Sequence, residues 1–338
     1  MTLPSTPILE VKSVKKHFPI QRGFLRRNVG VVRAVDGVSF TINEGETLGL
    51  VGESGCGKTT VAKLILRVLD ATEGSILFHR NGSAPVDITK LDRRELREVR
   101  RHIQLIFQDP FSSLNPRLPV FDIVAEPLLA HGWSRKDCED KVAELLEKVG
   151  LNPAYMRRYP HAFSGGQRQR IGIARSLISN PSLVVADEPV SALDVSVQAQ
   201  TLNLLNDLQE EFGLTYLFIS HDLSVIRYIC DRVAVMYLGK IVELAETEVL
   251  FPNPLHPYTS ALMASVPDAD PHSDWLYETI SGEAEQSLKT VRGCAFANRC
   301  RYAKDICLEQ EPVLKPVGDG TRQVACHRSA ELNLRGVG

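Results

Sequence analysis

The chain has 338 residues, of which 43% are hydrophobic, so it can form one large domain or two smaller ones with a proper core. Its 39 basic and 41 acidic residues give a formal net charge of −2, which offers no global reason to expect nucleic-acid binding. No apolar run approaches the length of a membrane span, and the N-terminus lacks a basic region followed by an apolar stretch. We therefore expect a cytosolic protein whose thiols are reduced.

The first fifty residues alternate between apolar and polar side chains. Residues 8–50 are predicted to form an antiparallel β-rich region that leads into a buried strand at residues 48–51. Within this region, residues 21–33 are basic and interrupted by glycine. We interpret them as a hairpin insertion; a solvated loop and a phosphate or lipid contact are the alternatives.

A phosphate-binding loop follows that strand. Residues 52–59 match G-x-x-x-x-G-K-[ST] and lie between a predicted strand and a predicted helix. The glycines allow successive backbone N–H groups to point at phosphate oxygens, and the helix N-terminus adds its positive dipole end. Lys58 is expected to reach the β- and γ-phosphates of a nucleotide, and the Thr59 hydroxyl to bind Mg²⁺. The predicted nucleotide contacts are Gly52, Ser54, Gly55, Cys56, Gly57, Lys58, Thr59 and Thr60, with the Cys56 thiol inert.

Residues 110–178 have a helical pattern and are predicted to form a helical insert. One helix covers residues 137–149, with its apolar side chains on one face and Gly150 as its C-cap. Another opens at F-S-G-G-Q, where Ser164, Gly165, Gly166 and Gln167 form a second anion-binding helix start. Two such starts enclose one nucleotide only when they are brought together, most simply in a head-to-tail dimer.

A second buried strand, residues 182–186, ends in two carboxylates, as in the Walker B pattern. Asp187 is expected to hold Mg²⁺ through water. Glu188 stands at the carboxyl edge of the sheet, where it is expected to polarise the attacking water. A general base of this kind contributes about 10²- to 10⁴-fold to the rate.

The last part of the chain is set apart by its composition. Strands are predicted at residues 214–220 and 232–237, and a proline-rich stretch at residues 251–258 marks a boundary. We therefore predict a nucleotide-binding domain at residues 1–253 and a C-terminal extension at residues 254–338.

Four of the seven cysteines lie in this extension, at Cys294, Cys300, Cys307 and Cys326. Their spacing is wider than the C-x₂₋₄-C pairs of structural zinc sites, whereas iron–sulfur clusters take four thiolates from more varied loops. Arg292, Arg299 and Arg301 flank the thiols and can offset the charge of a cluster. The residues leave an iron–sulfur cluster, zinc and plain reduced thiols open, and the compartment disfavours disulfides.

The F-S-G-G-Q segment resembles the signature of ATP-binding-cassette (ABC) ATPases, and further motifs in the expected order extend this resemblance over residues 8–330. It implies an α/β P-loop NTPase fold with a RecA-like core, an antiparallel β subdomain and a helical signature subdomain. Phe18 resembles the aromatic residue that stacks on adenine, and Gln108 the glutamine that touches Mg²⁺ and the attacking water. Asp194 resembles the D-loop aspartate, and His221 the switch histidine that faces the γ-phosphate.

Three segments are similar to the ATPase subunits of oligopeptide/dipeptide importers: residues 107–117, 186–200 and 253–259. Residues 254–326 look like that family's C-terminal extension, which is associated with a 4Fe–4S cluster on such cysteines. The resemblance implies that ATP hydrolysis powers the import of peptides. The same family also serves nickel, glutathione and some sugars, which are the alternative cargoes.

The resemblance also implies partners. Two ATPase subunits would sit under two integral membrane subunits on the cytoplasmic face of the membrane, fed by an external solute-binding protein. Residues 111–115 would line the cleft for a coupling helix. A homodimer and a heterodimer both fit the residues, and family habit favours the heterodimer. An exporter or a soluble cassette ATPase, such as a DNA-repair or cluster-assembly factor, would not explain residues 253–259.

Overall fold

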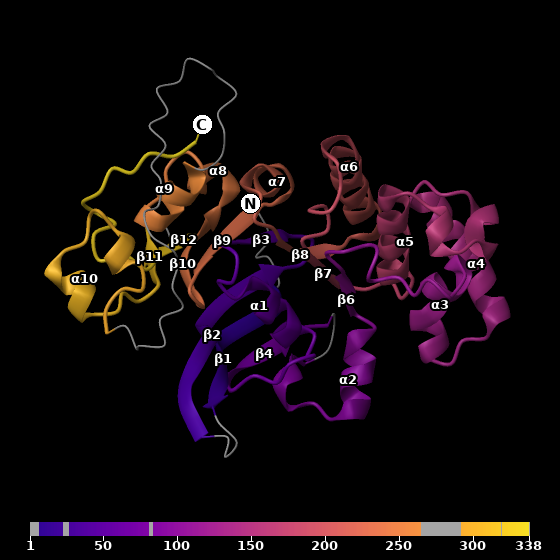
Figure 1. The fold of residues 1–338 in the computed structure, drawn as a ribbon, viewed down its shortest axis with the longest axis horizontal. Helices are drawn as coiled ribbons and strands as arrows, with labels where there is room; N and C mark the ends of the chain where they lie inside the picture. The colour runs from indigo at the N-terminus through magenta and orange to yellow at the C-terminus, as the bar shows by residue number, and fades with distance from the viewer. Residues whose placement is uncertain (1–6, 23–26, 81–83, 265–291, 319, 338) are drawn as a thin grey trace. The chain divides into compact units, whose positions relative to one another are not determined.

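The computed structural model describes residues 7–22, 27–80, 84–264, 292–318 and 320–337 (Figure 1). The chain forms two compact units, each assembled from separate segments. The first unit comprises Met1–Ile8, Ile42–Thr47 and Phe78–Ile219, and the second comprises Leu9–Thr41, Leu48–Leu77 and Ser220–Gly338. Among the described helices, none combines the length and the apolar character needed to cross a membrane.

The N-terminal region of the second unit is rich in strands, as predicted. Two long strands, β1 (Pro7–Arg22) and β2 (Arg27–Asn43), join β4 (Glu73–Phe78) in a sheet with the order β2-β1-β4. The basic segment at residues 21–33, interpreted as a hairpin insertion, includes residues 23–26, which lie outside the described residues.

The strand that feeds the phosphate-binding loop is β3 (Thr47–Val51), and all five of its residues are buried. It runs parallel to β9 (Arg232–Tyr237), with Leu48 opposite Arg232, and β9 pairs antiparallel with β10 (Lys240–Glu246). Strands from the tail continue this sheet, because β12 (Arg322–Val324) pairs with β10 and β11 (Lys315–Val317) pairs with β12. The C-terminal part therefore adds strands to the sheet that contains β3.

The helices of the second unit are short. The helix after the phosphate-binding loop is α1 (Lys58–Ile65). Helix α7 (Leu223–Ile229) is N-capped by Asp222, whose carboxylate accepts the Ser224 N–H. Among its described residues, this unit also contains the helices α8 (Thr247–Leu250), α9 (Pro257–Met263), η4 (Ala297–Arg299) and α10 (Asp305–Glu309).

The first unit contains three parallel strands in the order β8-β7-β6, namely β8 (Thr215–Ile219), β7 (Leu183–Asp187) and β6 (Ile103–Ile106). Four residues of β7 and all of β8 are buried. This burial agrees with their mostly apolar sequences, which are typical of parallel strands covered on both faces. The other regular elements before the helical insert are β5 (Val86–Asp87), η1 (Ile88–Lys90) and α2 (Arg93–Arg100).

The predicted helical insert is present in the first unit. Helices α3 (Val120–Ala130), α4 (Arg135–Lys148) and α5 (Gly165–Leu177) pack against one another (Figure 1). Ser134 caps α4 by accepting the Asp137 N–H, and Gly150 follows its end with a φ of 74°. The other helices here are η2 (Pro153–Arg157), η3 (Pro160–Ala162) and α6 (Val195–Phe212).

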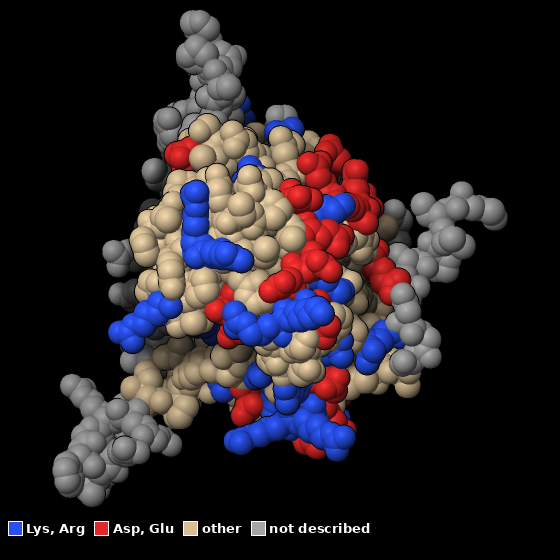
Figure 2. Space-filling view, turned by 90° about the vertical axis from the view of Figure 1, so that its right-hand side faces the viewer, with Lys and Arg blue, Asp and Glu red and all other residues tan. Residues whose placement is uncertain are grey.

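The buried and exposed sides of α4 differ as its sequence predicts. Val142, Leu145 and Leu146 are buried, whereas the acidic side chains of the helix lie at exposed positions. Figure 2 shows the face on which the helices of the insert lie, and Asp and Glu side chains gather on part of it. The helical insert is thus held by an apolar core, and the outer face of α4 presents charged side chains to water.

Candidate ATP-binding and hydrolysis site

The phosphate-binding loop of the second unit connects β3 to α1. Gly52, Gly55 and Gly57 have φ values of 152°, 79° and 115°, which L side chains rarely adopt. A Cβ at Gly57 would lie 2.2 Å from the backbone oxygen of Ala34. The loop can therefore keep this shape only with glycine at that position, and the predicted strand, loop and helix are all in place.

The Lys58 side chain folds back onto the loop that precedes it. Its ammonium donates hydrogen bonds to the carbonyls of Gly52 at 2.7 Å and Glu53 at 3.1 Å, and the residue is only 6% exposed. Thr59 is exposed at the first turn of α1, where a hydroxyl can reach a ligand. Burial raises the pKa of the Cys56 thiol, which favours its protonated, unreactive form, as expected from the sequence.

Gln108 and Glu188 come together in the first unit. The Gln108 amide donates a hydrogen bond of 2.7 Å from Nε2 to Oε2 of Glu188. Glu188 follows the end of β7 at Asp187, and its backbone has a φ of 49°. The Glu188 N–H is bonded to the carbonyl of Ile219 at 2.9 Å, which holds this uncommon conformation. Two residues that the sequence assigned to one reaction are therefore in direct contact.

The predicted signature helix begins where expected. Ser164 caps α5 by accepting the Gln167 N–H at 3.3 Å, and the Gln167 side chain accepts the Ser164 N–H at 3.1 Å. Gly166 lies against α6, because a Cβ there would be 2.5 Å from Cγ1 of Val197. The helix start is therefore a rigid, reciprocally capped turn.

Asp194 has a structural contact that its sequence motif did not suggest. Its carboxylate accepts the Val197 N–H at 2.9 Å and the Ser196 hydroxyl at 2.7 Å, so that it caps α6. These hydrogen bonds, the Val197 N–H first, lower the pKa of Asp194. The same sequence pattern, an aspartate ahead of a helical run, could have indicated this cap.

Two predicted residues of the second unit are exposed. Phe18 is 37% exposed, and the ammonium of Lys16 lies 5.1 Å from the centroid of its ring. His221 is exposed just before α7. Exposure leaves both rings accessible to a nucleotide, and their roles stay predictions.

Two residues of the second unit, Arg299 and Tyr258, contact Glu53 of the phosphate-binding loop, which the sequence did not predict. The Arg299 guanidinium pairs with both carboxylate oxygens of Glu53, and the Glu53 N–H donates to the Tyr258 hydroxyl. Arg299 is thus engaged with the loop, instead of offsetting the charge of a thiolate cluster as the sequence suggested. Because 246 residues separate the two charges in the chain, no local pattern could have revealed the pair.

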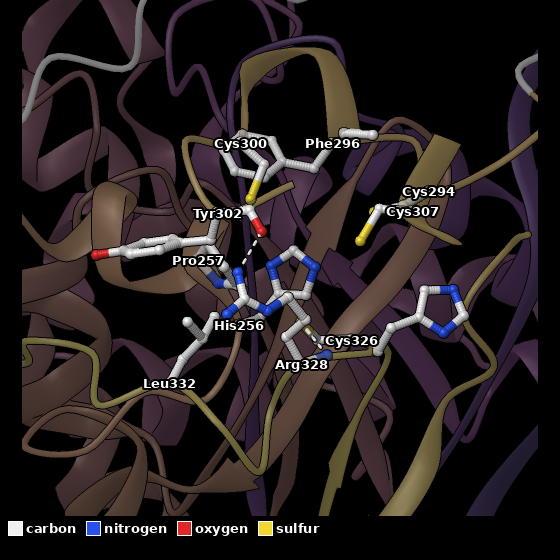
Figure 3. Close-up of a pocket in the computed structure, with 12 residues that line it drawn as sticks. His256, Pro257, Cys294, Phe296, Cys300, Tyr302, Cys307, Cys326, Arg328 and Leu332 are labelled. Atoms are coloured by element: carbon white, nitrogen blue, oxygen red, sulfur yellow. Dashed lines mark hydrogen bonds between the residues drawn. The ribbon is translucent and has the colours of Figure 1, made fainter. Parts of the chain in front are cut away.

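The four C-terminal cysteines surround one pocket (Figure 3). Cys300 lies on one side of it, and Cys294 and Cys307 lie on another, held together by a 2.7 Å hydrogen bond from the Cys294 N–H to the Cys307 carbonyl. Burial raises the pKa of Cys294 to about 11 and also raises the pKa values of Cys300 and Cys326. The protonated thiol is thereby favoured at these three positions.

The iron–sulfur cluster or zinc ion predicted at these cysteines has no support in this geometry. Within the described residues, no group of three or more His, Cys, Asp or Glu side chains is placed to hold a metal ion. The thiols therefore share a pocket without forming a ligand set, and spacing along the chain could not distinguish these two situations.

A buried ion pair fixes the tail to β10. Glu243 is fully buried, and its carboxylate accepts hydrogen bonds from the Arg322 guanidinium at 2.6 Å and from the backbone N–H groups of Leu255 and His256. His256 in turn accepts the Tyr258 N–H at 3.0 Å through Nδ1. These contacts position α9, and with it the Tyr258 hydroxyl that meets the phosphate-binding loop.

Comparison with known proteins agrees with this geometry. Residues 35–191 match the family described as ABC transporter, and residues 242–307 match the family described as oligopeptide/dipeptide transporter, C-terminal region. The chain is 54% identical over 324 residues to the oligopeptide transport ATP-binding protein AppF of Bacillus subtilis (strain 168), covering 95% of this chain and 97% of that protein. It is 47% identical over 325 residues to OppF of Salmonella typhimurium, covering 94% and 95% of the two chains.

Solved structures confirm the predicted cassette fold. A structure of the ATP-binding cassette MJ0796, described as a dimeric post-hydrolysis state bound to ADP and Pi, matches with a TM-score of 0.61 at 29% identity. The match covers 71% of this chain and 98% of that one. CbiO1 from Clostridium perfringens, described as part of the ABC transporter complex cbiONQ, matches with a TM-score of 0.60 at 25% identity, covering 72% of this chain and 90% of that one.

Proposed function

Because the chain belongs to the oligopeptide/dipeptide class of ABC transporter ATPases, we propose that its phosphate-binding loop binds ATP for a peptide importer and that Gln108 and Glu188 serve ATP hydrolysis. The chain is the ATP-binding subunit of such an importer, and it hydrolyses ATP. The observation that carries the residue assignment is the loop between β3 and α1, with its positive φ values and its enclosed Lys58.

The loop residues bind the phosphates. The N–H groups of residues 52–60 and the first turn of α1 present positive dipole ends, and Lys58 exchanges its carbonyl partners for β- and γ-phosphate oxygens. Phe18 stacks on the adenine ring. The hydroxyl, amide and carboxylate oxygens of Thr59, Gln108 and Asp187 are of the kind that Mg²⁺ prefers, so these residues would hold the ion. When bound, Mg²⁺ neutralises charge that develops on the phosphates.

The hydrolytic step is assigned to Glu188. Its carboxylate takes a proton from the attacking water, and the hydrogen bond from Gln108 to Oε2 fixes its orientation. His221 faces the γ-phosphate. Asp194 holds the first turn of α6, against which Gly166 of the signature helix packs.

We further propose a head-to-tail dimer with a second, different ATPase subunit. The amides of the capped α5 start, at Ser164, Gly165, Gly166 and Gln167, would contact the ATP on the partner's phosphate-binding loop. Supporting this arrangement, the related cassette MJ0796 has been described as a dimer. The pair would bind two integral membrane subunits at the cytoplasmic face of the membrane, with residues 111–115 at the coupling cleft and a solute-binding protein outside.

Co-purification tests this assignment. A tagged full-length chain extracted from membranes with mild detergent is expected to bring down two integral membrane proteins and a second ATPase. Recovery of the chain alone, or with nucleic acid, would contradict the importer assignment. Uptake of a labelled tripeptide, with nickel, glutathione and an oligosaccharide as competitors, then distinguishes peptide from the other cargoes.

We propose an iron–sulfur cluster at Cys294, Cys300, Cys307 and Cys326 as a separate prediction. This prediction comes from the resemblance to the importer family, in which four thiolates suffice for such a cluster. The four thiols line one pocket, although in the described residues they do not form a ligand set. Anaerobically purified protein is expected to be brown, with broad visible absorbance that Cys300→Ser removes. A colourless preparation with stoichiometric zinc, or with neither metal, would contradict the cluster.

A further inference from the structure

Glu53, at a variable position of the phosphate-binding loop, is held through three of its groups. Its carboxylate accepts hydrogen bonds from Arg299 at 2.9 Å and 3.0 Å, and its N–H donates to the Tyr258 hydroxyl at 2.9 Å. Its carbonyl accepts the Lys58 ammonium at 3.1 Å. The residue therefore connects two side chains of the C-terminal part to the lysine expected to bind phosphate.

Arg299 is itself fixed by its surroundings. It ends η4, where its N–H is bonded to the Phe296 carbonyl at 3.0 Å. Its guanidinium lies 5.7 Å from the Tyr237 ring and 5.9 Å from the Phe296 ring, and Nη1 also donates to the Tyr237 hydroxyl at 3.2 Å. The guanidinium thus has little freedom to turn away from Glu53.

Tyr258 is equally constrained. It is fully buried, and its ring centroid lies 4.6 Å from that of Tyr237 and 5.5 Å from that of Phe296. Tyr237, Tyr258 and Phe296 therefore form one block of three packed aromatic rings, and the Arg299 guanidinium lies against two of them. The block presents a guanidinium and a hydroxyl to the same loop residue.

The ion pair between Arg299 and Glu53 also neutralises the charge of the Glu53 carboxylate. The Arg299 and Glu53 side chains are only 11% and 25% exposed, so water screens the pair poorly, and its bidentate geometry is the strong form of this contact. An unpaired carboxylate at Glu53 would stand in the loop that receives a triphosphate, where it would repel the ligand. Arg299 removes this repulsion by neutralising Glu53.

We propose that Arg299 and Tyr258 are positioning residues of the ATP site, which keep the phosphate-binding loop in shape and its acidic residue neutralised. This inference rests on the proposed function, because it concerns the same loop and the same ligand. The C-terminal extension thereby supports nucleotide binding through Glu53, without itself contacting the nucleotide.

The test compares nucleotide affinity in the full-length chain, using MgATP and a fluorescent ATP analogue. Arg299→Ala is expected to raise the Kd for MgATP roughly fivefold to tenfold, since part of a charge-assisted contact is lost. The double variant Arg299→Ala/Glu53→Gln is expected to recover most of this loss, because the unpaired charge is gone. In the assembled transporter, the same pattern should appear in KM for ATP, with kcat nearly unchanged.

Arg301→Ala is the matched control. It removes a guanidinium two residues away that lies 4.7 Å from the Tyr302 ring, so the Kd of this variant should equal that of the wild type. A double variant as weak as Arg299→Ala would show that Arg299 does not act by neutralising Glu53 and would overturn that part of the proposal. So would an Arg299→Ala protein with the wild-type Kd.

Tyr258→Phe provides a second variant should Arg299→Ala fail to fold. It leaves the aromatic block intact but removes the acceptor of the Glu53 N–H, and it is expected to raise the Kd about twofold to threefold. An unchanged Kd in this variant would contradict the role of Tyr258. If the wild-type chain itself bound no MgATP, the proposed function would fail, which distinguishes that outcome from failure of this inference.

Discussion

Nε2 of Gln108 lies 2.7 Å from Oε2 of Glu188, although 80 residues separate the two in the chain. Gln108 lies two residues beyond the end of β6, Glu188 directly follows β7, and these two strands are parallel neighbours. Parallel strands end at the same edge of a sheet, so side chains just beyond their carboxyl ends can meet there. At this edge, Glu188, the proposed general base, has a hydrogen-bond partner that orients its carboxylate.

Replacing Glu188 by glutamine should separate ATP binding from ATP hydrolysis. Glu188→Gln keeps the size and hydrogen-bonding ability of the side chain but cannot accept a proton from water, so the hydrolysis rate should fall about 10²- to 10⁴-fold. Binding of MgATP should be unchanged, as measured by equilibrium fluorescence beside phosphate release. Glu210→Gln, at an exposed position of α6, is the control and should hydrolyse normally. Near-normal turnover in Glu188→Gln would remove Glu188 from this role.

His256 should make the stability of the protein depend on pH. Burial lowers its pKa to about 3 in the folded protein, whereas an unfolded histidine titrates near pH 6.5. The unfolded state therefore binds the proton first, and the stabilisation present above about pH 6.5 is lost as the pH falls towards about 3. Between about pH 7.5 and about pH 5, we expect a loss of about 2 kcal/mol of unfolding free energy from this residue.

Urea unfolding at these two pH values measures the effect. His256→Asn keeps an N-cap for α9 but cannot be protonated, so its unfolding free energy should change less between the two conditions. Equal pH dependence in the wild type and in this variant would show that His256 does not titrate in this way.

Removing Arg322 should destabilise the C-terminal part strongly. Arg322→Ala leaves the Glu243 carboxylate fully buried without its cationic partner, which costs about 3–5 kcal/mol for buried pairs of this kind. Urea unfolding of the full chain is the measurement. Lys15→Ala breaks an exposed pair with Glu73 and should leave the midpoint unchanged. A similar shift in both variants would contradict the importance of the buried pair.

Two glycines of α5 should respond to alanine in opposite ways. A Cβ at Gly172 meets no atom within 4 Å, so Gly172→Ala should stabilise the helix by about 1 kcal/mol through its higher helix propensity. A Cβ at Gly166 would lie 2.5 Å from Cγ1 of Val197, whose branched side chain turns with difficulty. Gly166→Ala should therefore lower the melting temperature that Gly172→Ala raises. Equal shifts in calorimetry would show that the packing against α6 is unimportant.

The sequence by itself determined the local parts of this protein. A strand, a glycine loop and a helix at residues 47–65 could be predicted because turn chemistry and hydrophobic period act over a few residues. The helix start at Ser164 could be predicted for the same reason, since its cap satisfies an amide only three residues away. The helix predicted from residue 137 begins two residues earlier, at Arg135, because Ser134 caps it. The order of these motifs also indicated the cassette fold.

Only the tertiary structure decided which distant side chains meet. The sequence placed Arg299 among the cysteines, but folding brings its guanidinium to Glu53, and it brings Arg322 to Glu243. The tertiary structure also showed that the four cysteines line one pocket but do not form a metal ligand set among the described residues. Such contacts depend on strand order and packing, which follow from the free energy of the whole chain, so a local pattern cannot reveal them.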